Sequence, residues 1–156
     1  MSSYVNFYLR MNNSFAPIGS YSRSNEIYQA IQHAVPYEKI TPLTSRAFDE
    51  MIRELESKAQ KMADAKKRDQ ERIALIMNAA NTSLDEKLSA VAEIESNFAD
   101  MDEYISDVNF AADTFRVFLN IIDDVRYSDN TYMDNDCDHY IYAGIEAYGR
   151  MEDVIE

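Results

Sequence analysis

Cys137 and His139 are the side chains best suited to bind a metal ion or to act as a nucleophile and its base, and they lie only two residues apart. A structural zinc site needs four ligands, and the chain's other histidine, His33, is far away in the sequence. Side chains at positions i and i+2 of a helix or strand do not meet well, which disfavours a Cys–His catalytic pair. We therefore expect neither a metal site nor a catalytic thiol.

The acid-rich segment 134–138 places Asp134, Asp136 and Asp138 at alternate positions, as the opening of an EF-hand calcium loop does. The rest of that motif is missing, since His139 takes the place of the turn glycine and Ile145 that of the bidentate glutamate. The chain also has no Gly-rich phosphate loop, no Ser/His/Asp set and no HExxH motif. We predict a protein that is not an enzyme and that uses no cofactor and no metal.

Negative charge is concentrated in the second half of the chain. Of the 28 acidic residues, 19 lie between Met77 and Glu156, where only four basic residues accompany them. A field of this kind attracts positively charged partners and repels nucleic acid and anionic membranes. The charge pattern therefore predicts a protein partner with a basic surface, most simply a nucleic-acid-binding protein, with no direct binding of nucleic acid or membrane.

The acids themselves follow a heptad repeat. Glu86, Glu93, Asp100 and Asp107 recur every seven residues, so a helix would carry them in one column about 10 Å apart. A row of carboxylates on a rigid helix can imitate a phosphate backbone, and nearby tyrosines can supply binding hot spots. The predicted partner-binding face also includes Glu103, Asp123, Asp124, Tyr127, Asp129, Tyr132, Asp134 and Asp136. The alternative interpretation is a solvated helix face without a partner.

In its small size, its acidity and its lack of catalytic motifs, the chain resembles as a type the phage-encoded inhibitors of host nucleases, including anti-CRISPR proteins. This resemblance implies a non-enzymatic inhibitor that acts by nucleic-acid mimicry in the host cytoplasm. A structural or adaptor protein that dimerises through its helices is an alternative. A third is a small enzyme or ligand binder at the Tyr/Asp-rich C-terminal region.

A cytoplasmic location is expected from three features of the sequence. The chain has one cysteine, no apparent signal peptide, and no stretch of 18 uncharged apolar residues.

Two long helices are expected to position the acidic face. The first is predicted over residues 42–80, beginning at Thr41-Pro42, and the second over residues 84–126, beginning at a capping box of Ser83 and Glu86. The three residues between them predict an antiparallel hairpin. The second helix carries a coiled-coil seam of Val91, Ile94, Phe98, Met101, Ile105, Val108, Ala112, Phe115, Leu119 and Ile122.

Lys66 interrupts the apolar stripe of the first helix and is predicted to face Phe98, with Glu95 and Asp102 beside it as ion-pair partners. The second helix stays apolar at this level, so the seam residues Phe98, Met101 and Ile105 are predicted to contact a third helix, most simply in a homodimer.

Residues 1–41 and 127–156 are predicted to form a small head at the base of the hairpin within a single domain, residues 1–156. Tyr4–Met11 alternates with period two, which predicts a strand with one buried face made of Val5, Phe7, Leu9 and Met11. A second strand over Phe15–Tyr21 is confined to a sheet edge by Pro17. A short helix over residues 25–35 would be capped by Ser24, and a C-terminal helix would begin at Asp136 or Asp138, with a strand over His139–Ala143 as the alternative. The expected fold class is mostly α, of the α+β type.

Overall fold

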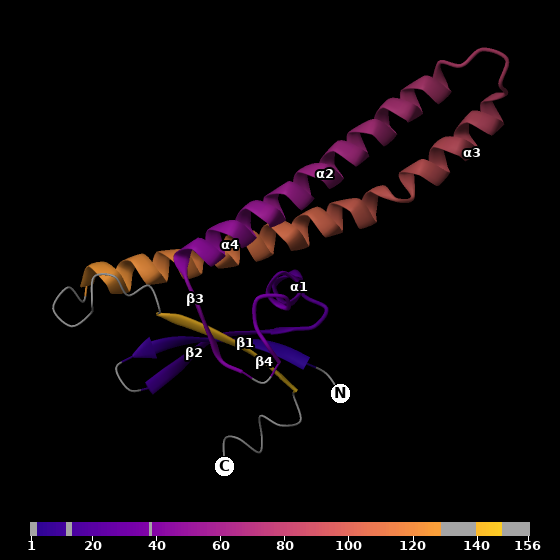
Figure 1. Cartoon of the computed structure of the whole chain (residues 1–156). Helices are drawn as coiled ribbons and strands as arrows, with labels where there is room; N and C mark the ends of the chain where they lie inside the picture. The colour runs from indigo at the N-terminus through magenta and orange to yellow at the C-terminus, as the bar shows by residue number, and fades with distance from the viewer. Residues whose placement is uncertain (1–2, 12–13, 38, 129–139, 148–156) are drawn as a thin grey trace.

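The computed structural model describes residues 3–11, 14–37, 39–128 and 140–147, and it has the mixed α+β architecture expected from the sequence (Figure 1). The elements follow the order β1 (Ser3–Met11), β2 (Ser14–Ser22), α1 (Glu26–Ile31), β3 (Thr41–Leu43), α2 (Ser45–Met77), α3 (Leu84–Glu95), α4 (Phe98–Ser128) and β4 (Ile141–Ala147). Helix α2 leads away from the sheet, and α3 and α4 lead back toward it (Figure 1).

The four strands form one antiparallel sheet in the order β2-β1-β4-β3. On the predicted buried face of β1, Val5 and Phe7 are fully buried and Leu9 packs partly buried against the core. The alternation is incomplete, because Asn6 between Val5 and Phe7 is also only 4% exposed. The edge position predicted for β2 is confirmed. The β1–β2 pairing shifts where Phe7 pairs with Gly19 and Tyr8 pairs with Pro17, which leaves one extra residue on β2 and makes a β-bulge.

The C-terminal segment forms the strand β4, Ile141–Ala147, so the predicted helix from Asp136 or Asp138 is wrong. The alternative strand over His139–Ala143 is confirmed for residues 141–143, and β4 continues beyond it to Ala147. β4 lies between β1 and β3, and its apolar residues Ile141, Ala143 and Ile145 are buried at alternate positions. Pairing with a neighbour on each side outweighs the weak helical pattern of this segment. Residues 129–139, which include the calcium-like segment, lie outside the described part of the chain.

One face of the sheet packs against helices α1, α2 and α4 (Figure 1). Four phenylalanines connect the layers. Phe7 of β1 lies 4.7 Å from Phe118 and 6.4 Å from Phe115 between ring centroids, and Phe48 of α2 lies 5.6 Å from Phe115. Edge-on and tilted contacts of this kind favour a fixed arrangement of the rings. The aromatic cluster therefore joins the base of α2 and α4 to the sheet.

Two predicted helix starts are wrong by a few residues. Thr41–Leu43 forms β3 by pairing with β4, so α2 begins at Ser45 with Thr44 as its N-cap, whose hydroxyl accepts a hydrogen bond from the Ala47 amide at 3.1 Å. Helix α1 is capped by Asn25 and not by Ser24, and it ends at Ile31.

The predicted continuous helix over residues 84–126 is bent, because α3 ends at Glu95 and α4 begins at Phe98. At the break, the Ser96 hydroxyl donates a hydrogen bond to the Glu93 carbonyl at 2.6 Å, and the Asn97 amide bonds to the carbonyl three residues back. A serine that bonds to its own backbone in this way competes with the regular helical bonds. The predicted N-cap of α3 is confirmed, since the Ser83 hydroxyl accepts from the Glu86 amide.

Candidate functional site

The four heptad acids lie on the surface of the two helices that return to the sheet. Glu86 and Glu93 belong to α3, Asp100 and Asp107 belong to α4, and all four are exposed. The bend between the helices divides the predicted column into two pairs. Glu103, Asp123 and Asp124 are exposed on α4 as well, and Tyr127 lies in its last turn. The predicted site residues Asp129, Tyr132, Asp134 and Asp136 lie outside the described part of the chain.

Two bases beside these helices pair with other acids. Lys66 of α2 lies 2.7 Å from Asp102 of α4, and Arg116 of α4 pairs both with Asp113 and with Glu56 of α2. Among the residues that the structure describes, no ion pair involves the four heptad acids. Their carboxylates are therefore available to an external base.

The predicted contact between Lys66 and Asp102 is confirmed, and it changes the interpretation of the seam beside it. The Lys66 ammonium also lies 5.5 Å from the centre of the Phe98 ring, within the range of a cation–π interaction. Phe98, Met101 and Ile105 are all half-buried. Lys66 therefore partly covers the apolar seam that was predicted to contact a third helix.

Asp107 lines a small cavity of about 130 Å³ beside the start of α1, together with Ser24, Asn25, Glu26 and Phe110. Phe110 is 55% exposed, so much of its surface faces solvent. Two carboxylates next to an aromatic ring suit a cationic group, because the carboxylates attract its charge and the ring face favours a cation. Of the four heptad acids, Asp107 is the one that lines a described cavity.

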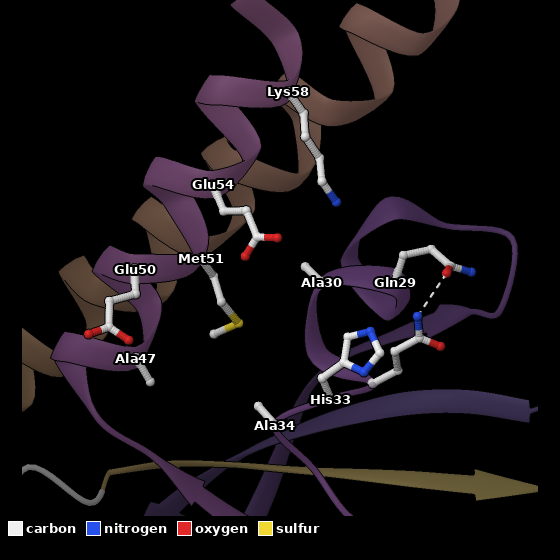
Figure 2. A pocket seen from close by; sticks show the side chains of 10 residues that line it. Gln29, Ala30, His33, Ala34, Ala47, Glu50, Met51, Glu54 and Lys58 are labelled. Carbon is white, nitrogen blue, oxygen red and sulfur yellow. Dashed lines mark hydrogen bonds between the residues drawn. The ribbon is translucent and has the colours of Figure 1, made fainter. Parts of the chain in front are cut away.

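A larger cavity of about 380 Å³ lies between α1 and the first half of α2 (Figure 2). It is lined by Gln29, Ala30, Gln32, His33, Ala34, Ala47, Glu50, Met51, Glu54 and Lys58. The alanines and Met51 supply an apolar part, whereas Glu54 and Lys58 bring opposite charges from one face of α2 (Figure 2). In the described hydrogen-bond network His33 has no carboxylate partner, so no nucleophile and oriented base meet here. The cavity can hold a small polar group or a basic side chain, and the sequence alone did not reveal it.

An aromatic cluster on the sheet face opposite the helices was also missed. The Phe15 ring centre lies 6.5 Å from that of Tyr8 and 5.0 Å from that of Tyr142, whose hydroxyl accepts a 3.4 Å hydrogen bond from Arg10. Burial raises the pKa of the Tyr8 hydroxyl, and the charge of Glu146 and a hydrogen bond to it raise it further. A sequence signal was present for Tyr8 and Arg10, because both occupy the second face of the alternating strand β1.

No group of three or more His, Cys, Asp or Glu side chains in the described ranges is arranged to hold a metal ion. No helix within those ranges is long and apolar enough to cross a membrane. Comparisons of the chain with known protein families, with curated proteins and with solved structures each found no match. The functional interpretation therefore depends on the surfaces described above.

Proposed function

We propose that this chain is a non-enzymatic, acidic protein-binding module whose α3 and α4 surface binds the basic groove of a nucleic-acid-binding protein. Such a module inhibits its partner by occupying the place of the nucleic acid, in the manner of phage-encoded nuclease inhibitors. The main support is that Glu86, Glu93, Asp100 and Asp107 are exposed and form no ion pair within the described residues. Uncompensated charge of one sign steers a partner of the opposite sign and strengthens its contacts.

We further propose that α2 and the bent pair α3–α4 act together as one antiparallel helical hairpin carried by the head. Support comes from two ion pairs between α2 and α4, one between Lys66 and Asp102 and one between Glu56 and Arg116. α2 also packs against α4. A helix held along its length by a second helix presents its acids with little loss of entropy on binding.

The spacing of the acids is compatible with mimicry. Seven residues of helix advance about 10.5 Å, and three phosphates of one strand of duplex DNA advance about 10.2 Å along its axis. Within α3 or within α4, one heptad acid thus corresponds to every third phosphate of a strand. A protein groove with Arg and Lys side chains at phosphate positions can therefore form charge-assisted hydrogen bonds with several of these acids.

The test is reversal of the two acids on α4 in the double variant Asp100→Lys/Asp107→Lys. The matched control is Asp49→Lys/Glu71→Lys, which makes the same change in net charge at exposed positions on α2. The tagged full chain is used to capture proteins from host lysate at about 50 mM and about 500 mM salt, a range over which exposed charges become screened. Captured proteins are then challenged with duplex DNA.

We expect the unaltered chain and the control to capture a nucleic-acid-binding protein that high salt or duplex DNA releases. Each charge-assisted contact contributes about 1.5–3 kcal/mol, so the α4 variant should bind at least about 100-fold more weakly. Circular dichroism checks that both variants keep their helical content. Equal capture by the α4 variant, or a captured protein that duplex DNA does not displace, would contradict the proposed function.

A further inference from the structure

The proposed hairpin of α2 with α3 and α4 is called the helical arm here, and its outer end is residues 61–95. This outer end carries an unusual amount of exposed apolar surface. Leu75, Leu84, Leu88 and Met77 are 73%, 62%, 52% and 39% exposed, and they are four of the nine large apolar side chains exposed in the described residues. Only a few residues further along α3, Val91 and Ile94 are buried. Leu84 and Leu88, four residues apart on α3, share one face of the helix, and neighbouring exposed apolar side chains mark an interaction surface.

The same part of the arm carries both signs of charge, one on each helix. Residues 61–77 of α2 hold five bases and three acids, whereas α3 holds four acids and one base. Lys87, the single base of α3, donates a hydrogen bond to the Met77 carbonyl at the end of α2. Lys67 and Arg68 on α2 and Asp85 and Glu95 on α3 are exposed and form no ion pair with any described residue.

We propose that residues 61–95 bind a second copy of this chain. A two-fold dimer brings the same surface of both copies together, so that surface must be complementary to itself. With the two-fold axis along the arm, α2 of each copy lies antiparallel beside α3 of the other, as in a four-helix bundle. This arrangement places bases of α2 next to acids of α3 twice and buries the leucines. A basic partner would instead meet Lys67 and Arg68 as like charges.

Residues 61–95 include Glu86 and Glu93, which are proposed to bind the basic partner, but the dimer uses the opposite face of α3, so this inference does not depend on the proposed function. Leu84 and Leu88 are four residues apart and share one face of α3. Glu93 is nine residues beyond Leu84, which places it about 180° around the helix. Dimerisation therefore leaves the heptad acids exposed.

The size of the surface indicates a weak dimer. The twelve residues of α3 extend about 18 Å, and two helices side by side are about 20 Å wide, which gives roughly 400 Å² per copy. Stable interfaces bury about 800 Å² per partner. We therefore expect dissociation in the micromolar range, and the measurement must extend from about 1 µM to about 200 µM chain.

Sedimentation velocity of the full chain over this range is the first test. We expect a monomer–dimer equilibrium that is lost in Leu84→Glu/Leu88→Glu. It should be retained in the matched control Phe110→Glu/Val117→Glu, which alters two side chains of similar exposure on α4. A chain that stays monomeric at about 200 µM would overturn the proposal. If that monomer bound anionic or neutral lipid vesicles, the exposed leucines would serve a membrane and not a second copy. A dimer that persists in the leucine variant would also overturn the proposal.

A mixing experiment tests the arrangement of charges. One variant carries Arg68→Glu on α2, and the other carries Glu95→Lys on α3, because these two charges lie at about the same height along the arm. Each variant by itself places like charges opposite one another twice. The dissociation constant of its dimer should therefore be at least about 10-fold higher than that of the unaltered chain. An equal mixture restores both attractive contacts and should recover the dimer, which also shows that both variants are folded. A mixture no better associated than its components would rule out this interface.

Discussion

Replacing Phe115 by alanine tests the aromatic cluster that joins the base of α2 and α4 to the sheet. The Phe115 side chain is fully buried, with its ring centre 6.4 Å from that of Phe7, 5.6 Å from that of Phe48 and 6.5 Å from that of Phe118. A buried Phe→Ala change costs about 3–5 kcal/mol, because it removes apolar contacts and leaves a cavity. We expect about 4 kcal/mol here, a large part of the roughly 5–15 kcal/mol that stabilises a typical domain.

The assay is urea unfolding followed by circular dichroism. With a slope of about 2 kcal/mol per molar urea, the midpoint should fall by about 2 M while the slope stays unchanged. The control is Phe110→Ala, which lies on the same helix but is 55% exposed and should cost less than about 1 kcal/mol. If the two variants lost similar stability, or if Phe115→Ala cost less than about 1 kcal/mol, the packing of α4 against the sheet and α2 described here would be wrong.

Three further predictions concern single contacts. A double-mutant cycle between Lys66 and Asp102, whose side chains are 26% and 57% exposed, should give a coupling of about 0.5 kcal/mol that shrinks in high salt; a coupling near zero at low salt would contradict the pair. Thr44→Ala should lower the free energy of unfolding by about 1 kcal/mol and Thr44→Ser by much less, because only alanine lacks the capping hydroxyl; equal losses would reject the cap. Burial and the charge of Glu146 raise the pKa of Tyr8, so the folded state holds that proton longer and stability should fall as the pH rises above about 10; a Tyr8→Phe variant with the same decline in urea unfolding would refute this.

Part of the fold could be predicted from local patterns. Val5 and Phe7 marked the buried face of β1, and Pro17 confined β2 to an edge because proline cannot donate to a neighbouring strand. The contact between Lys66 and Asp102 followed from counting residues on either side of the loop near residue 82. In each case the prediction depended on a property of the side chain itself: apolar side chains are buried, proline has no amide to donate, and opposite charges pair.

Other features depended on partners distant in the sequence. Thr41–Leu43 has a strong helix-start pattern, yet it forms β3 because β4 lies beside it. The same pairing converts Ile141–Ala147 into a strand. The cavity between α1 and α2 could not be predicted either, because its lining combines residues 29–34 with residues 47–58, whose approach depends on the packing of both helices.

The position of β4 between β1 and β3 has a consequence for the order in which the protein folds. Asn6 of β1 donates a hydrogen bond to Glu146 of β4 across 140 residues of sequence, whereas α2 and α3 are separated by a short loop. Closing so long a loop is slow, and segments made early during synthesis fold first when their contacts are local. The helices can thus associate while the chain is still being synthesised, but β1 and β3 remain unjoined until residues 141–147 leave the ribosome. Until then their unpaired edges are open to other chains, so the newly made protein is most prone to aggregate in its sheet and not in its helices.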